Sequence, residues 1–185
     1  GVLDNSSVDT YTGDGFLFDA AELIVKVKQP LEEGLGYLQA RHIVFSFLHL
    51  AAQPVLTRQL CDIGLTAIAF ESVVDRSGGR PLLAPMSGVA GNMAVTMGSY
   101  YLARPNGGKG MLLGDVLGNA YGKVVIIGDG IVGRHAARAA AGMGAQVIVF
   151  GRHPEREPSL QREIAPSIHY LLSEPEGIAH QLRDA

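Results

Sequence analysis

The sequence has little that would suit a disulfide-linked, membrane-spanning or nucleic-acid-binding protein. Cys61 is its single cysteine, so no disulfide can form within the chain, and we expect a cytoplasmic setting. No apolar run approaches the roughly 18 residues that span a bilayer, and no signal peptide is evident. The net charge is −3 and no basic stripe occurs. We therefore expect neither nucleic acid nor a membrane as partner.

Two common kinds of ligand site are also missing. His153, His169 and His180 share no metal-ligand spacing, so we expect no metal site. The glycine-rich residues 105–110 lack the spacing and the terminal Lys-Ser/Thr of a P-loop. Hydrophobic residues make up 47% of the chain and charged residues 18%, which is typical of a globular protein with a good core.

The strongest pattern in the sequence is a strand, a glycine-rich turn and a helix, in that order. Residues 124–127 form a short, β-branched apolar run typical of a buried parallel strand. The turn that follows has glycines in the order G-x-G-x-x-G, at Gly128, Gly130 and Gly133. Helix formers at 136–141 and a second apolar run at 147–150 complete a strand–helix–strand unit.

This spacing predicts a turn that binds the pyrophosphate of a dinucleotide. The first glycine permits a sharp turn, the second lets backbone approach the pyrophosphate, and the third lets the helix pack against the strand. The helix N-terminus adds unpaired N–H groups and a partial positive charge. A glycine turn with only a structural role is the alternative, because the motif alone is weak evidence.

The end of the second strand usually distinguishes NAD from NADP. An acidic residue about 20 positions after the glycines accepts hydrogen bonds from the ribose hydroxyls of NAD. Gly151 stands there, followed by Arg152, His153 and Arg156, so the sequence predicts no carboxylate at this place. Arg152 is able to pair with a 2′-phosphate, which favours NADP slightly over NAD. A solvated loop that happens to be basic is the alternative.

The first part of the chain alternates strand-like and helix-like segments, which is typical of a parallel sheet. Strands are expected at 23–27, 43–48 and 66–70, and helices at 31–41 and 55–62. Residues 1–18 have no clear period and are expected to be irregular.

Three polar residues follow the carboxyl ends of these strands, which is where open α/β sheets bind ligands. They are Lys28, His49 and Glu71. An amine there can hold a substrate carboxylate, and an imidazole can move a proton near neutral pH. A surface lysine and a structural histidine are the alternatives for Lys28 and His49.

The whole chain is therefore expected to be an α/β protein with two Rossmann-like parallel-sheet domains. Residues 1–104 would form a substrate domain ending in a long helix at 89–102, with Ser87 near its start. Residues 105–185 would form a dinucleotide-binding domain, continued by a helix at 158–164, a strand at 168–172 and a helix at 174–184. Only the first half of a complete dinucleotide fold would be present. We therefore expect a partial chain.

Several segments together resemble the alanine dehydrogenase and pyridine nucleotide transhydrogenase family. They lie at residues 22–30, 47–52 and 83–87 and at the Gly128 turn, in family-like order and spacing. The resemblance implies an oligomeric amino acid dehydrogenase that converts L-alanine to pyruvate and ammonia. Hydride would pass from the substrate Cα to NAD or NADP.

The resemblance also implies roles for individual residues. Lys28 matches the lysine that binds the substrate carboxylate and carbonyl, and His49 the catalytic histidine. Ser87 matches a position beside the nicotinamide, and Ser173 a serine near the adenosine. Gly151 departs from the family, which has an acidic ribose ligand there. A substrate arginine and a later aspartate have no counterpart, so this chain alone is expected to be incomplete for turnover.

Two other functions remain open. One is an NADP-dependent reductive condensation of an amino acid with a 2-oxo acid, of the opine type, which Arg152 favours. The other is a catalytically silent dinucleotide-binding module that has diverged from the family at residues 29, 88, 115–119 and 151.

Overall fold

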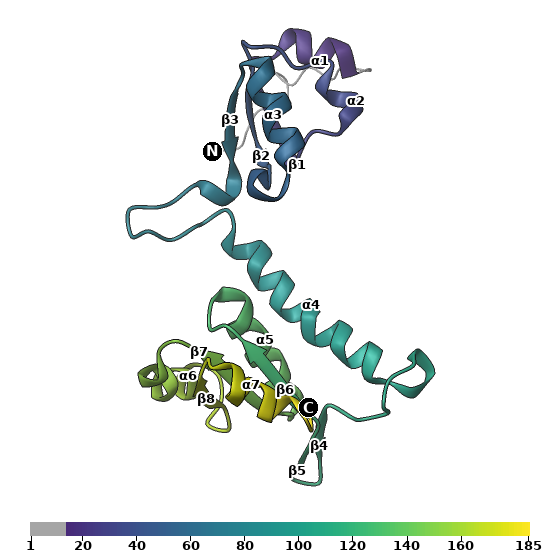
Figure 1. Cartoon of the computed structure of the whole chain (residues 1–185), viewed down its shortest axis with the longest axis vertical. Helices are drawn as coiled ribbons and strands as arrows, with labels where there is room; N and C mark the ends of the chain where they lie inside the picture. The colour runs from purple at the N-terminus through teal and green to yellow at the C-terminus, as the bar shows by residue number, and fades with distance from the viewer. Residues whose placement is uncertain (1–13) are drawn as a thin grey trace, which may run out of the picture. The chain divides into compact units, whose positions relative to one another are not determined.

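The chain divides into two compact units, residues 1–83 and 84–185. The computed structural model describes residues 14–185, coloured from purple to yellow in Figure 1. Each unit is built on its own three-stranded parallel sheet, with strand orders β1-β2-β3 and β6-β7-β8. The expected α/β class with parallel strands is confirmed.

The first unit follows the predicted alternation of strands and helices. Its elements are α1 (Asp14–Ala20), β1 (Leu23–Lys28), α2 (Glu32–Leu35), β2 (Ile43–Phe47), α3 (Pro54–Ile63) and β3 (Thr66–Ala69). Short 3₁₀ turns follow β2 at Leu50–Ala52 and β3 at Phe70–Ser72. The buried side chains of Ile24, Val44, Leu48, Leu56 and Leu60 join the sheet to α3 in one core. Connections between parallel strands carry the chain back each time, so the carboxyl ends of all three strands share one edge.

Two expectations for this unit are wrong. The helix expected at 31–41 is only α2, which ends at its C-cap Gly36, because glycine lowers helix stability. Part of the segment expected to be irregular, 1–18, is helical from Asp14 onward, and the rest lies outside the described residues. One distant side chain supports this helix: Arg41 donates to the carbonyls of Phe18 and Asp19 at 3.0 and 2.9 Å.

The second unit contains the glycine turn. Its elements are α4 (Ala84–Leu102), the hairpin β4 (Gly114–Val116) and β5 (Asn119–Tyr121), β6 (Lys123–Ile127), α5 (Ile131–Met143), β7 (Gln146–Gly151), α6 (Glu157–Glu163), β8 (His169–Leu172) and α7 (Pro175–Leu182). The central strand of the parallel sheet is β7, and its side chains Val147, Val149 and Phe150 are buried. Ala136, Ala137 and Ala140 bring α5 close to it.

The long helix α4 groups with the second unit, whereas the sequence placed it at the end of a first domain at residue 104. The physical reason is close packing against α5. A Cβ on Gly91 would overlap the Val132 carbonyl and would lie 2.7 Å from the His135 Cβ. The helix also begins earlier than expected, at Ala84, so Ser87 lies in its first turn instead of before it.

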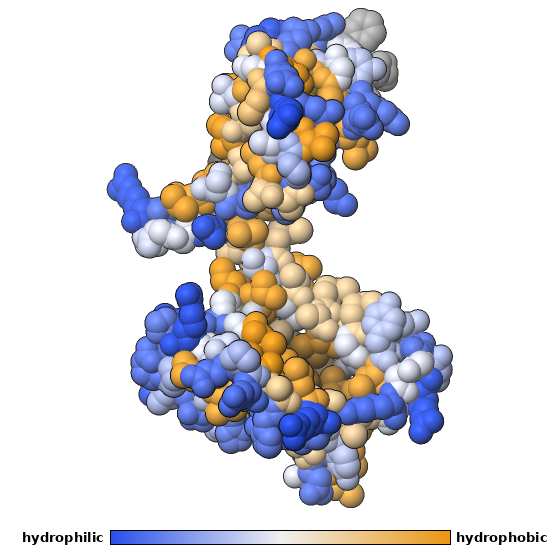
Figure 2. Space-filling model, viewed as in Figure 1, coloured by the Kyte–Doolittle hydropathy of each residue, from blue (hydrophilic) through white to orange (hydrophobic). Residues whose placement is uncertain are grey.

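Apolar side chains are exposed along α4. Met86, Val89, Met93 and Tyr100 are 49–57% exposed, and Figure 2 shows orange surface over this helix. The oligomer that the family resemblance implies remains a prediction. Across residues 14–185, no helix is long and apolar enough to cross a membrane.

Candidate functional site

The three glycines of the G-x-G-x-x-G motif form a turn of the shape that their spacing predicts. Gly128 has a φ of 108°, which only glycine adopts readily, and its N–H donates to the Phe150 carbonyl at 2.7 Å. Gly130 is the N-cap of α5, with extended backbone. A Cβ on Gly133 would overlap the Gly128 carbonyl. Any larger residue at 133 would therefore push α5 away from the end of β6.

The turn leaves room for a ligand at the start of α5. A Cβ built on Gly130 would meet nothing within 4 Å among the described residues. The first N–H groups of a helix have no partner within it, and α5 is 13 residues long, so its dipole favours an anion here. The residues present therefore fit a pyrophosphate, which would lie against the backbone of Gly130.

Other predicted cofactor residues reach the same edge of the sheet. Gly151 ends β7, and its carbonyl accepts a hydrogen bond from the Ser173 N–H at 2.8 Å. Arg152 follows Gly151 and is exposed. Ser87 is half-buried in the first turn of α4, where the next residue, Gly88, packs on His135 of α5. The structure thus brings Gly128, Gly151 and Ser173 together.

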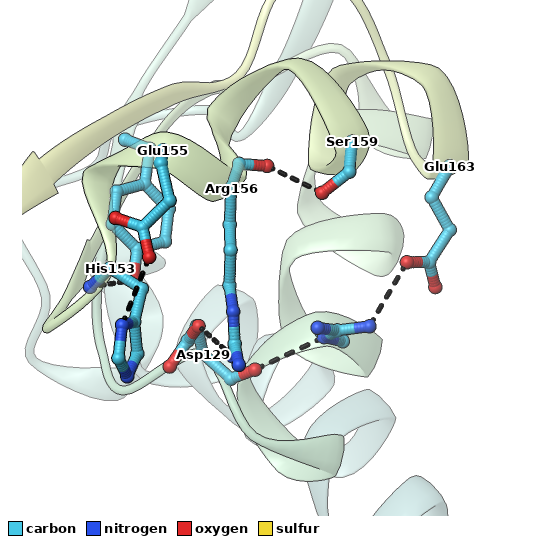
Figure 3. Close-up of polar contacts among 8 residues, drawn as sticks. Asp129, His153, Glu155, Arg156, Ser159 and Glu163 are labelled. Carbon is cyan, nitrogen blue, oxygen red and sulfur yellow. Dashed lines mark hydrogen bonds and ion pairs between the residues drawn. The ribbon is translucent and has the colours of Figure 1, made fainter.

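A carboxylate stands at this edge, contrary to the prediction from the sequence. It belongs to Asp129, the residue between the first two glycines of the turn (Figure 3). Arg156 Nη1 lies 3.1 Å from Asp129 Oδ2, and the Tyr170 hydroxyl is a second polar neighbour that favours the charged carboxylate. Arg134 Nε donates to the Asp129 carbonyl at 3.1 Å. The Asp129 side chain is 17% exposed.

The charge of Asp129 is stabilised by these partners. Burial opposes ionisation, but the hydrogen bonds from Arg156 and Tyr170 outweigh it and hold the pKa of the Asp129 carboxyl below its usual value. Burial raises the pKa of the Tyr170 hydroxyl, and the neighbouring Asp129 charge adds to the effect. The tyrosine therefore stays a hydrogen-bond donor while the aspartate stays an anion.

Sequence reasoning missed Asp129, Tyr170 and the pairing of Arg156. One signal was available: an acidic residue inside a turn that should attract phosphates is out of place unless its side chain points elsewhere. Its partners are 27 and 41 positions further along the chain. No local pattern connects them.

In the first unit the structure brings His49 and Glu71 together through the backbone. The His49 N–H donates to Glu71 Oε1 at 2.6 Å, and the Leu48 N–H approaches Glu71 Oε2 at 3.4 Å. His49 has a φ of 51°, a left-handed conformation that a non-glycine residue seldom adopts. The Glu71 carboxylate therefore holds the turn after β2, which leaves the His49 imidazole exposed and beside the Phe47 ring, 6.2 Å between centroids.

An open pocket of about 440 Å³ adjoins this turn, with His49, Ala67, Glu71 and Ser72 in its lining. Lys28 ends β1, is exposed, and pairs in register with Phe47 of β2. It shares the sheet edge with His49 but does not line the pocket. The predicted placement at strand ends is thus observed for all three residues, and a shared pocket only for His49 and Glu71.

Comparisons with known proteins define the family. Residues 94–185 match the model described as "Alanine dehydrogenase/PNT, C-terminal domain", and residues 11–90 match "Alanine dehydrogenase/PNT, N-terminal domain". The chain belongs to the alanine dehydrogenase/PNT family.

Individual relatives agree with this assignment. Alanine dehydrogenase of Bacillus subtilis is 46% identical over 89% of this chain and 43% of its own length. The enzyme of Mycobacterium tuberculosis H37Rv is 46% identical over 80% of this chain and 40% of its own length. A solved L-alanine dehydrogenase superposes with a TM-score of 0.78 and 43% identity, covering 91% of this chain and 47% of the other. The chain therefore spans less than half the length of these relatives.

A transhydrogenase structure from Sinorhizobium meliloti shares the fold, with a TM-score of 0.59 at 20% identity over 82% of this chain and 45% of the other. None of these comparisons supports the expected lean towards NADP. The structure weakens its basis too, because a carboxylate accompanies the arginines at this edge.

Proposed function

We propose that this chain binds NAD(H) and belongs to an oxidoreductase that deaminates L-alanine, or a related amino acid, to the 2-oxo acid and ammonia. The observation that carries the proposal is the shape of the glycine turn: a left-handed Gly128, an open Gly130 and a Gly133 packed on the Gly128 carbonyl. Family membership supports the reaction. The second unit would be the dinucleotide domain and the first unit the substrate domain.

In the second unit, the backbone would bind and orient the cofactor. The N–H groups at the start of α5, beside Gly130, would hold the pyrophosphate. Bound NAD would supply its nicotinamide ring as the hydride acceptor. The backbone of Gly151 and Ser173 marks the neighbouring end of the site, where the adenosine would lie.

In the first unit, Lys28 would hold the substrate carboxylate and His49 would move the proton. The Lys28 ammonium is exposed at the end of β1 and provides a charged donor for a carboxylate. The His49 imidazole Nε2 or Nδ1 would take the proton that the amine loses as the substrate gives up hydride and becomes an imine, and water would then convert the imine to the carbonyl with release of ammonia. Glu71 would act as a positioning residue, because it binds the backbone of His49 and not its ring.

Binding of NADH tests the proposal directly. The full chain is titrated into NADH and the nicotinamide emission followed, which is free of tryptophan background because the chain has no tryptophan. Gly130→Val places a branched side chain in the open space over the turn, so folding should be retained and NADH affinity should fall at least tenfold. Gly142→Ala adds a methyl on α5 where a Cβ meets nothing among the described residues, and it should leave binding unchanged.

The catalytic assignments need a second readout. NADH, pyruvate and ammonium are added together and loss of NADH absorbance is followed for the chain and for His49→Gln and Lys28→Met. Oxidation that both substitutions abolish, with NADH affinity unchanged, supports the proposed roles. Oxidation would exclude the silent dinucleotide-binding module, whereas NADH binding without oxidation is also the result expected of a chain that lacks the substrate arginine and the later aspartate. A folded chain that does not bind NADH would overturn the proposal.

A further inference from the structure

A buried glycine ends β7 at the place where dinucleotide folds usually carry an acidic side chain. A Cβ on Gly151 would overlap the Tyr170 hydroxyl and would lie 2.5 Å from Tyr170 Cζ. It would also lie 3.2 Å from Asp129 Cγ. Two side chains from neighbouring elements therefore occupy the space that a side chain at 151 would need.

The Asp129 carboxylate is held in this space by three elements. Its backbone leaves β6 in the glycine turn, Arg156 reaches it from the turn Pro154–Arg156, and Tyr170 reaches it from β8. The His153 N–H donates to the Tyr170 hydroxyl at 3.3 Å, which holds that hydroxyl near the carboxylate. Figure 3 shows the Asp129 carboxylate and the Arg156 guanidinium pointing toward each other.

We infer that Asp129 replaces the missing acid at 151 and accepts the hydrogen bonds of the adenosine ribose, which makes it the residue that selects NAD(H) over NADP(H). The inference rests on the proposed dinucleotide binding in the second unit. A carboxylate within 3.2 Å of the 151 Cβ position supplies the acceptor that a ribose diol requires, from a different part of the chain. Its negative charge disfavours a 2′-phosphate at the same place.

Arg156, which also lies at this edge, does not cancel this selection. Arg156 forms an ion pair with Asp129, with Nη1 and Oδ2 3.1 Å apart. A 2′-phosphate would have to compete with that carboxylate for the same guanidinium. Removing the carboxylate would therefore free Arg156 and reverse the selection.

The test is a pair of titrations, with NADH and with NADPH, of the full chain and of Asp129→Ala. The unchanged chain should bind NADH more tightly than NADPH. In the variant, NADH should weaken about tenfold or more, because a hydrogen bond to a charged acceptor contributes about that much. Binding of NADPH should become tighter. The dissociation constant of NADPH divided by that of NADH should therefore fall at least about a hundredfold. Glu155→Gln is the matched control, since it removes a negative charge at the residue directly before Arg156, on a side chain 70% exposed.

Three results would overturn the inference while leaving the proposed function intact. They are NADH binding that Asp129→Ala does not weaken, NADH binding that the variant strengthens, and tighter NADPH than NADH binding by the unchanged chain. The second would mean that Asp129 closes the ribose site instead of serving it. A folded chain that binds neither dinucleotide would refute the proposed function itself, and with it the inference.

Discussion

Substitution of Gly151 by alanine should destabilise the second unit through one identifiable neighbour. The added methyl would overlap the Tyr170 hydroxyl and approach Cζ to 2.5 Å, and Tyr170 is only 4% exposed, so its ring has little room to move. Overpacking of this kind costs about 1–3 kcal/mol. Replacing a strand glycine by alanine returns about 0.5–1 kcal/mol. Because hydroxyl and ring carbon both clash, we expect a net loss of about 2 kcal/mol.

Native-state hydrogen exchange of the buried β7 amides, Val147 to Phe150, measures this loss within the second unit alone. Tyr170→Leu removes the clashing atoms. In that background Gly151→Ala should stabilise the unit by about 0.5–1 kcal/mol, giving a coupling free energy of about 2.5–3 kcal/mol between the two positions. Gly142→Ala, in open space on α5, should instead stabilise the unit slightly. An equal cost of Gly151→Ala with and without Tyr170 would refute the packing argument.

Three further predictions concern the turn and the strand ends. The lowered pKa of Asp129 contributes stability that is present above the ordinary aspartate pKa and lost as pH falls below it. Amide protection of the second unit should therefore decrease less steeply with falling pH in Asp129→Asn than in the unchanged chain. Gly133→Ala should open the α5–β6 packing and abolish NADH binding together with β7 protection, because its Cβ would overlap the Gly128 carbonyl. Glu71→Ala should release the left-handed His49 backbone and raise amide exchange at 48 and 49, whereas Glu71→Gln should retain most of the protection; equal exchange in both would contradict the role given to the carboxylate.

Local features were predictable from the sequence. The glycine turn could be predicted because all three glycines lie within six residues and each is required by the backbone geometry of that short segment. The structure shows this requirement at Gly128 and Gly133. The strands β1, β2 and β3 could be predicted from their apolar runs, which also placed Lys28, His49 and Glu71 at one sheet edge.

Features that depend on contacts between residues distant in the sequence could not be predicted. The helix α1 receives hydrogen bonds from Arg41, more than 20 positions away, so its own sequence shows no clear helical signal. The α4 helix joins the second unit because Gly91 lets α5 approach, a contact that helical periodicity cannot reveal. The absence of an acidic residue at 151 favoured NADP slightly when the sequence was considered alone. The position of the Asp129 carboxylate could not be predicted, because it depends on Tyr170 and Arg156, which are distant in the sequence.

The most direct test of the central claim is a map of NADH binding by backbone amide chemical shifts. The isotope-labelled chain is titrated with NADH and the shift changes are assigned to residues. We predict that the largest changes fall on the turn from Gly128 to Ile131, on Gly151 and Arg152, and on Ser173. Largest changes instead around the first-unit pocket beside His49 and Glu71, or no changes in a folded chain, would contradict the account.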